Sequence, residues 1–441
     1  MFLRSIKIAI VLLLICSSAI SQVVTRSEFA PYTLRKDADA RTHTPSDTYI
    51  EFNPTLSTSA LGLSVREQTV EVSQSWVDAV AMFHVENPGS AYTLTVNGKS
   101  VAECEDSYTP TDYNITPYLF VGSNSVKIIS RPSRLSQLEE GLKVSARKPF
   151  EGSYIYTQRR LRILDYQLEL TEHTEGQHGQ LFIDIIVENG FNYPETIEVG
   201  FDVYDPAGKL HDFSTAKATV EGNSVDTIRF APHLYGAAKY RWDPSKKADQ
   251  SLYSVMIFTK HNGVSSNYIP FKVGFTLPKY AYEKLTVWDK DIILKAVSYN
   301  ALGDAKQAET ELTALRQQGY NTIAPDYPQP LWFYSLCDKL GLWVIDQAAI
   351  NAPTAAGDKK VGGSPSNDPA LRDEYLERMQ KTYYRTRNFS CVVAYSLGGS
   401  SGNGYNMYKA YQWLKSVEKV RPIIYQGAGG EWNNDILKIG R

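Results

Sequence analysis

The chain has 441 residues, of which 43% are hydrophobic, enough apolar material for about two to four domains. Its formal net charge is -2, and basic and acidic residues are interspersed. This balance excludes the basic surface that nucleic acids or anionic membranes require, so neither is an expected partner, and it is compatible with a neutral ligand. No apolar run after the N-terminal region is long enough to form a transmembrane segment.

The N-terminus has the layout of a secretory signal. Arg4 and Lys7 precede an apolar run from Ile8 to Ile15, and small residues follow. The small-x-small pattern of Ala19-Ile20-Ser21 predicts cleavage there, which assigns residues 1–21 to the signal peptide. We therefore expect a secreted protein whose mature chain begins near Gln22.

Cys16 allows a second interpretation, a lipoprotein signal, since it follows Leu13-Leu14-Ile15. Lipoprotein signals usually carry a small residue directly before the cysteine, and Ile15 is bulky, so this interpretation is the weaker one. The other cysteines are Cys104, Cys337 and Cys391. Their wide separation without a CxxC pair predicts neither a disulfide framework nor a zinc site, and we expect all three to be free and buried. No motif indicates a metal or a cofactor.

Residues 22–158 alternate apolar and polar positions in short runs such as Ala79–Val85 and Tyr92–Val96. Such runs predict the strands of an all-β jelly-roll sandwich. Asn97-Gly98 follows the second run and predicts a two-residue hairpin turn, because both turn positions need positive φ.

Residues 159–276 contain longer runs of the same kind, including Leu181–Val187 and Ile197–Tyr204, with a turn at Asp205–Gly208. About seven strands in this stretch predict an immunoglobulin-like β-sandwich without its disulfide. Leu277–Tyr280 is the predicted linker to the next domain.

Residues 277–441 alternate short apolar runs with helical patterns, which indicates parallel β/α units. Asp304 is a good helix N-cap with Gln307 three residues on, and Gly319 is a good stop. Five strands and four helices make about half of a TIM-type barrel, an incomplete (β/α) barrel whose open sheet would leave an unpaired edge and uncovered apolar faces. The predicted strands are Ile292–Val297, Tyr320–Ala324, Leu342–Ile345, Cys391–Tyr395 and Pro422–Tyr425, and the predicted helices are Asp304–Gln318, Pro330–Leu340, Asp368–Thr386 and Tyr405–Val417.

Several long motifs, in order along the chain, resemble glycoside hydrolase family 2, the β-galactosidase-like group. The resemblance covers almost the whole mature chain and implies its sugar-binding jelly roll, its sandwich and its barrel. The motifs are Val96–Val101 with Asp106–Leu119, Leu331–Asp346, Arg387-Asn388 with Ser396-Leu397-Gly398, and Tyr411–Val417 with Arg421-Pro422. Together with the signal, it implies a bacterial periplasmic or outer-membrane-associated protein.

Retaining glycosidases need two carboxyl groups about 5 to 5.5 Å apart, and on a barrel these lie at the C-terminal ends of strands. In the family, Asn-Glu follows Ser-Leu-Gly, whereas this chain has Gly399-Ser400 there. The resemblance therefore places Ser400 at the acid/base position, where a hydroxyl cannot act as a carboxylic acid. It also implies a nucleophile on a later strand, beyond Arg441. We expect both catalytic carboxylates to be missing.

Other positions that surround the substrate in the family also differ. Asp346-Gln347-Ala348-Ala349 stands for Asp-Glu-Ala-Asn, and Ser298-Tyr299-Asn300-Ala301 stands for Asn-Arg-His-Glu. Pro325-Asp326-Tyr327-Pro328 keeps only the Tyr-Pro half of a usual Ser-His-Tyr-Pro. The remaining candidates for ligand binding are Asn300, Tyr327 and Gln347, with Trp432 in a glycine-rich loop, because aromatic faces stack on sugar rings.

Asp326, Asp346 and Glu431 are each predicted just after a strand, near one barrel face, so a pair of them could replace the lost carboxylates. The structural alternative is favoured: Asp346 is an end-of-strand residue, Asp326 caps a loop and Glu431 is solvated. The main hypothesis is therefore a non-catalytic family 2-like envelope protein that binds a glycan, or serves as a scaffold or subunit for a protein partner or a second copy. The alternative is an active glycosidase that uses displaced carboxylates or a partner chain.

Overall fold

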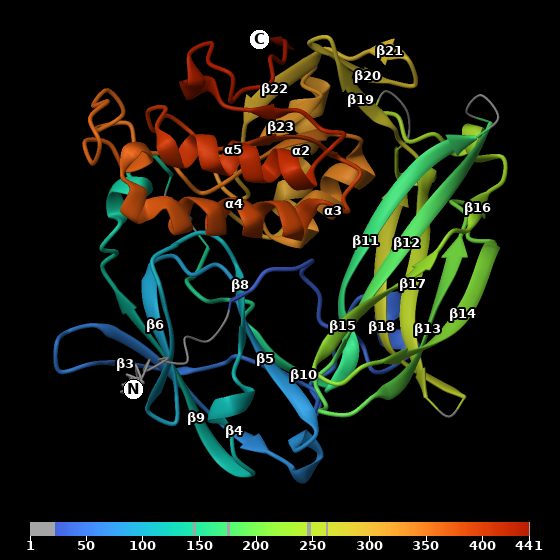
Figure 1. Ribbon diagram of the computed structural model, residues 1–441, viewed down its shortest axis with the longest axis vertical. Coiled ribbons are helices and arrows are strands. Elements are labelled where there is room, and N and C mark those ends of the chain that lie inside the picture. Colours follow the sequence, from blue (N-terminus) through green and yellow to red (C-terminus); the bar gives the residue numbers. More distant parts are fainter. Residues whose placement is uncertain (1–22, 144–146, 174–176, 245–247, 262, 441) are drawn as a thin grey trace, which may run out of the picture.

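The structure, a computed structural model, describes residues 23–440 apart from 144–146, 174–176, 245–247 and 262. The predicted signal peptide and Cys16 lie outside the described residues. Three bodies are visible in Figure 1: a jelly roll at the lower left, an immunoglobulin-like sandwich at the right and an α/β unit at the top. The fold class predicted from the sequence is confirmed.

The jelly roll consists of two five-stranded sheets, with strand orders β1-β8-β5-β10-β2 and β3-β4-β9-β6-β7. Apolar side chains that alternate along the strands, such as Phe83, Leu94 and Val126, are buried between the sheets. The strands are β1 (Val23–Val24), β2 (Tyr49–Glu51), β3 (Thr55–Thr58), β4 (Ser64–Val72), β5 (Ala79–Val85), β6 (Ala91–Val96), β7 (Lys99–Cys104), β8 (Thr111–Asn114), β9 (Gly122–Arg131) and β10 (Tyr154–Arg159).

The predicted hairpin at Asn97-Gly98 is confirmed. β6 and β7 pair antiparallel on either side of these two residues, whose φ angles are +51° and +74°. The Asn97 side chain also bonds across the sheet end, donating from Nδ2 to Asn124 Oδ1 at 2.8 Å. Asn97 thus adopts the positive φ that the turn requires, and its side chain bonds to Asn124.

The second sandwich also has two sheets, β11-β12-β15 with β16 attached to β12, and β14-β13-β17-β18. The inward-facing residues of both, such as Ile183, Val199 and Ile257, form its core. The strands are β11 (Leu161–His173), β12 (His178–Asn189), β13 (Glu195–Tyr204), β14 (Leu210–Val220), β15 (Ser224–Phe230), β16 (His233–Leu234), β17 (Leu252–His261) and β18 (Val264–Gly274).

The N-terminal segment ties the two sandwiches together. After β1 pairs with β8, Tyr32 forms a β-bridge with Tyr268 of β18, and α1 (Arg35–Ala40) packs there before β2 rejoins the jelly roll. The linker predicted at Leu277–Tyr280 is in part a strand. β19 (Pro278–Ala281), β20 (Lys284–Val287) and β21 (Lys290–Asp291) form a small antiparallel sheet, since the chain turns back at Tyr282-Glu283 and again at Trp288-Asp289, all with positive φ.

The α/β unit carries a parallel sheet in the order β26-β25-β24-β23-β22-β27. Asp304 caps α2 as predicted: its side chain accepts a hydrogen bond from the backbone N–H of Gln307. The two central strands are Trp343–Gln347 and Val392–Ser396, and nearly all of their residues are buried. The elements are β22 (Leu294–Ser298), α2 (Ala305–Gln317), β23 (Thr322–Ala324), α3 (Leu331–Leu340), β24 (Trp343–Gln347), α4 (Arg372–Thr386), β25 (Val392–Ser396), α5 (Tyr405–Val417), β26 (Ile423–Ile424) and β27 (Ile439–Gly440).

Both outer edges of the parallel sheet, which we expected to be unpaired, are paired in part. β27 pairs parallel with β22 at one edge. At the other edge the Asp435 backbone N–H donates to the Ile423 carbonyl at 2.7 Å, and the Asp435 carboxylate accepts from the Ile423 N–H at 2.7 Å. The segment 433–440 therefore contacts both edges, which a sequence pattern of two-residue strands could not predict.

Short 3₁₀ helices connect several of these elements: η1 (Gln74–Trp76), η2 (Thr116–Tyr118), η3 (Ser136–Leu138), η4 (Ala237–Tyr240), η5 (Ala248–Ser251), η6 (Pro365–Asn367), η7 (Pro369–Leu371) and η8 (Gln426–Ala428). Cys104, Cys337 and Cys391 are free and buried, as predicted. Within the part of the chain that the structure describes, none of the helices is long and apolar enough to cross a membrane.

Candidate functional site

Five polar side chains at the C-terminal ends of the barrel strands are linked by hydrogen bonds, and we call them the polar row. Ser298 Oγ donates to Asp326 Oδ1 at 3.2 Å, and Asn300 Nδ2 donates to Asp326 Oδ2 at 2.9 Å. Gln347 Nε2 donates to the Asp326 carbonyl at 2.8 Å, and Ser396 Oγ donates to Gln347 Oε1 at 3.1 Å. The row thus brings the predicted candidates Asn300, Asp326 and Gln347 together.

Asp326 is the one carboxylate of the polar row, and several hydrogen bonds fix its position. Besides the two side-chain donors, its backbone N–H donates to Asn300 Oδ1 at 2.9 Å. The residue is half-buried, and each carboxylate oxygen keeps a lone pair for a further donor. Asp326 therefore caps its loop, and its carboxylate is also held in a fixed orientation as a hydrogen-bond acceptor at the strand ends.

Asp346 does not join the row, because it lies on the opposite side of its strand. Its carboxylate is fully buried, accepting from Tyr334 on α3 at 2.7 Å and from Thr386 on α4 at 2.8 Å. Burial raises the pKa of Asp346 to about 6, although the two hydroxyl donors lower it. Successive residues of a strand face opposite ways, so Gln347 points to the row and Asp346 to the helices.

Glu431 and Trp432 also pack on a helix. Tyr408 of α5 donates its hydroxyl to Glu431 Oε2 at 2.6 Å, and its ring stacks on Trp432 with centroids 5.3 Å apart. Trp432 remains 56% exposed, so part of its surface is open to solvent. Of the three carboxylates expected near one face, Asp346 points instead to α3 and α4, while Glu431 bonds to Tyr408 in the first turn of α5.

Ser400 is exposed in the turn after β25, and its neighbour Gly399 is tightly packed. A Cβ at Gly399 would lie 2.7 Å from the side chain of Asn351, and a Cβ at Gly141 of the jelly roll would lie 2.5 Å from it. Asn351 Nδ2 donates to the Gly141 carbonyl at 2.9 Å. One asparagine therefore fills the space between two glycines and joins the barrel loop to the jelly roll.

Tyr327 is buried at the same junction, with 2% of its surface exposed. Its ring packs against Tyr108 of the jelly roll, with centroids 4.5 Å apart. Its position makes it a contact between domains.

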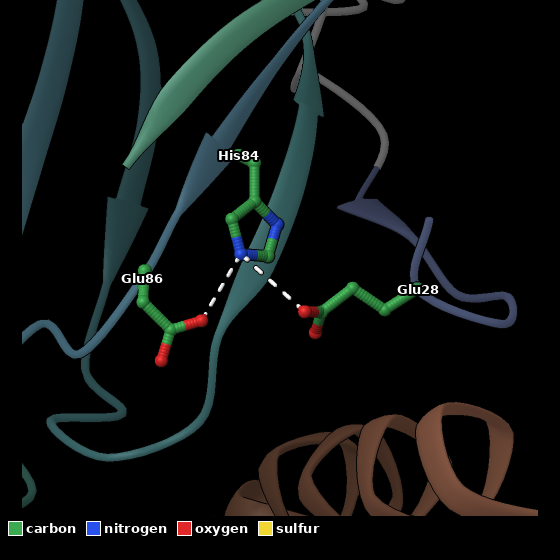
Figure 2. Close-up of side chains that lie close together, drawn as sticks. All are labelled: Glu28, His84 and Glu86. Carbon is green, nitrogen blue, oxygen red and sulfur yellow. Dashed lines mark hydrogen bonds and ion pairs between the residues drawn. The ribbon is translucent and has the colours of Figure 1, made fainter. Parts of the chain in front are cut away.

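A second polar cluster, Glu28, His84 and Glu86, was not predicted from the sequence. His84 Nε2 lies 3.2 Å from Glu86 Oε2 and 3.7 Å from Glu28 Oε1. Figure 2 shows this ring nitrogen facing both glutamates. Burial lowers the pKa of His84, but the surrounding carboxylates, Glu28 and Asp112 among them, outweigh it and raise the pKa to about 10. Glu28 is far from His84 in sequence, and no motif spans the two segments.

Comparison with known proteins agrees with this architecture. Residues 19–159 match the sugar binding domain of glycosyl hydrolases family 2, and residues 301–439 match the TIM barrel domain of that family. The chain belongs to glycoside hydrolase family 2. The two matched ranges include β5 to β8 of the jelly roll and, in the barrel, Asp326, Gln347 and Ser396 of the polar row.

Curated relatives in family 2 include β-galactosidases. That of Priestia megaterium is 24% identical over 376 residues, covering 82% of this chain and 36% of the relative. That of Pectobacterium atrosepticum is 26% identical over 390 residues, covering 82% of this chain and 35% of the relative. The chain spans about a third of the length of these relatives.

Solved structures share the fold. The Bacteroides uniformis β-glucuronidase has a TM-score of 0.68 at 14% identity, covering 92% of this chain and 52% of that chain. A family 2 glycosyl hydrolase of Bacteroides cellulosilyticus has a TM-score of 0.67 at 12% identity, covering 92% of this chain and 57% of that chain. The likeness extends over both sandwiches and the α/β unit.

Proposed function

We propose that this family 2 protein is non-catalytic and binds a glycan at the polar row. The observation that carries the proposal is the composition of the row: Asp326 is its one carboxylate, while Ser400 stands where the family motif has its acid/base glutamate. Retaining glycoside hydrolysis needs two carboxyl groups about 5 to 5.5 Å apart, and an inverting mechanism needs two about 6.5 to 9.5 Å apart.

The other candidate carboxylates are poorly placed to complete such a pair. Asp346 is turned toward α3 and α4, with both oxygens occupied by hydroxyl donors. Glu431 accepts a hydrogen bond from Tyr408 on the helix layer. A single oriented carboxylate is suited to accepting hydrogen bonds from sugar hydroxyls, because charged acceptors form the stronger hydrogen bonds.

Glycan binding is tested by screening the mature protein on a glycan array and measuring its hits by isothermal titration. Asp326→Asn removes the charge at nearly constant volume, so affinity for a bound glycan should fall by about tenfold or more. Asp289→Asn, at a carboxylate 84% exposed on the β20–β21 turn, is the matched control and should bind as the wild type does. Absence of glycan binding by the wild type would refute this proposal.

The second candidate function is an active glycosidase in which Asp326, Glu431 or a partner chain replaces the lost carboxylates. The favouring observation is the firm orientation of Asp326 by Ser298 and Asn300, as a catalytic group requires. The two candidates differ in turnover: an active glycosidase would release nitrophenol from nitrophenyl glycosides, and a glycan-binding protein would not.

We also propose an envelope location, from the signal layout of residues 1–21. We propose a protein partner or a second copy because segment 433–440 pairs with only part of each edge of the parallel sheet. Fractionation of native cells should place the protein in the periplasm or at the outer membrane, and deletion of 2–21 should retain it in the cytoplasm. Pull-down from the native envelope and light scattering of the pure protein test the partner and the second copy. A cytoplasmic wild type would exclude the location.

A further inference from the structure

Three donor atoms from two parts of the chain converge beside β5. Glu28 lies in the segment after β1, His84 is on β5, and Glu86 directly follows β5. Their donor atoms all lie within 4.8 Å of one another, and the three side chains are only 11%, 2% and 13% exposed. Ligands of a tetrahedral ion with bonds of about 2.0 Å are about 3.3 Å apart, close to the 3.2 and 3.7 Å observed.

The outer contacts of the cluster are those of a metal site. Asp112 Oδ1 lies 2.8 Å from His84 Nδ1, an interaction that holds the proton on Nδ1 and leaves Nε2 to face the two glutamates. Asp112 is itself held by Arg26, at 2.8 Å. A carboxylate behind the histidine is the arrangement that orients imidazole ligands in metal centres.

The glutamates are oriented in the same way. Arg385 Nε donates to Glu28 Oε2 at 2.6 Å, and Arg147 donates to Glu86 Oε1 at 3.3 Å. Each arginine therefore holds one oxygen and leaves the other directed at Nε2. Glu28 Oε1 lies 3.7 Å from Nε2, too far for a hydrogen bond with the ring, so the histidine alone does not satisfy it.

We propose that Glu28, His84 and Glu86 bind a divalent transition-metal ion of the zinc class. One imidazole nitrogen with two carboxylate oxygens is a donor set that Zn²⁺ accepts, whereas Mg²⁺ prefers oxygen ligands alone and keeps several waters. Glu28 and Glu86 border a cavity of about 680 Å³, and Glu28 also borders, with His84, a small pocket of about 20 Å³, so two of the three ligands face open space. The ion would join the N-terminal segment to β5, next to α4 of the barrel.

The experiment is calorimetric titration of the EDTA-dialysed mature chain with Zn²⁺ at pH 8. One Zn²⁺ per chain is expected, with much weaker binding of Mg²⁺. X-ray absorption of the zinc-loaded wild type should show nitrogen and oxygen ligands with imidazole scattering and no sulfur. No stoichiometric binding, or a sulfur ligand from one of the buried cysteines, would overturn the proposal.

Variants separate this site from other zinc ligands on the chain. Glu28→Gln and Glu86→Gln should each weaken Zn²⁺ binding by at least tenfold, and Asp112→Asn by about tenfold through the loss of histidine orientation. Glu151→Gln is the control, since Glu151 lines the same cavity but contacts Lys148. Circular dichroism without zinc checks that each variant folds; a folded Glu28→Gln that binds like the wild type contradicts the proposal.

Discussion

At the residue scale, the side chain of Asn351 limits which residue fits at position 399, next to Ser400. Its side chain occupies the space that a Cβ at Gly141 or Gly399 would need, at 2.5 and 2.7 Å. Family 2 motifs have asparagine where this chain has Gly399, so restoring that residue requires Asn351 to move. The glycine at position 399 and the contact that Asn351 makes with Gly141 of the jelly roll therefore depend on each other.

Gly399→Ala should lower the free energy of unfolding by about 1 to 3 kcal/mol, the cost of overpacking a filled site. The loss should shrink when Asn351→Ala is present, because the two changes share one space. Gly357→Ala is the control, since no atom lies within 4 Å of its Cβ position. Urea unfolding of the four variants measures this, and strictly additive losses would contradict the coupling.

The pKa of Asp346 makes stability depend on pH. Burial raises this pKa from 3.8 to about 6, so the folded state holds the proton more tightly than the unfolded chain does. The stabilisation is present below pH 3.8 and is lost as pH rises through 6. Between pH 4 and 7.5 this amounts to about 2 kcal/mol.

Asp346→Asn removes that titration. The fall in the free energy of unfolding between pH 4 and 7.5 should therefore be about 2 kcal/mol smaller in Asp346→Asn than in the wild type. Denaturant unfolding at the two pH values measures the difference. Asp373→Asn, on the exposed start of α4, should follow the wild type. Equal pH dependence in Asp346→Asn and the wild type would show that the carboxyl does not titrate in this range.

At the scale of elements, segment 433–440 completes the parallel sheet. Asp435 bonds to the Ile423 backbone, accepts from the Tyr411 hydroxyl at 2.9 Å and pairs with Lys415. β27 then lies along β22 at the opposite edge. Edge strands with open backbone groups invite association with other chains, and this segment satisfies part of both edges.

Asp435→Ala should destabilise the protein by about 1 to 3 kcal/mol, because the buried Ile423 N–H loses its charged acceptor. Hydrogen exchange should show faster exchange at Ile423 and across β27. The matched control is Asp373→Ala, whose carboxylate is 82% exposed and pairs with Arg372 at the surface. Unchanged protection at Ile423 would mean that the segment does not hold the β26 edge.

The helices and longer strands could be predicted because their signals are local. α5 begins at Tyr405 and ends at Val417, as its apolar period predicts, and Asp304 caps α2 through the expected N–H. β27 and β19 could not be predicted, because strands of two to four residues take their order from pairing partners distant in sequence.

At the site, sequence resemblance identified Asn300, Asp326 and Gln347, which the structure brings together. It could not place Asp346 correctly, because a shift of one residue along a strand reverses the side on which a side chain lies. The Glu28 cluster also escaped prediction, since no local pattern marks residues that meet only through the packing of two segments.

At the scale of the whole molecule, α4 joins the barrel to both sandwiches, and Figure 1 shows it lying over the jelly roll. Its Arg378 is buried and bonds to Glu139 of the jelly-roll side at 2.7 Å and to the Ala349 carbonyl at 2.6 Å. Arg387 pairs with Asp165 of β11 at 2.7 Å. Charged side chains on α4 and at its C-cap therefore contact both sandwiches.

Arg378→Ala should destabilise the protein by about 3 to 5 kcal/mol, because it leaves Glu139 and Asp106 buried without their cation. Calorimetry should show the jelly roll melting apart from the barrel. Arg372→Ala, on the same helix and 48% exposed, should change the melting temperature little. A single transition at the wild-type temperature in Arg378→Ala would show that this arginine does not couple the domains.

Whether this family 2 protein is non-catalytic can be measured as turnover of nitrophenyl β-galactoside and related nitrophenyl glycosides by the purified mature protein. We expect nitrophenol release no faster than in buffer, for the wild type and for Asp326→Ala and Glu431→Ala alike. Turnover above buffer that is abolished by Asp326→Ala or Glu431→Ala, and kept by Asp289→Ala, would instead establish an active glycosidase.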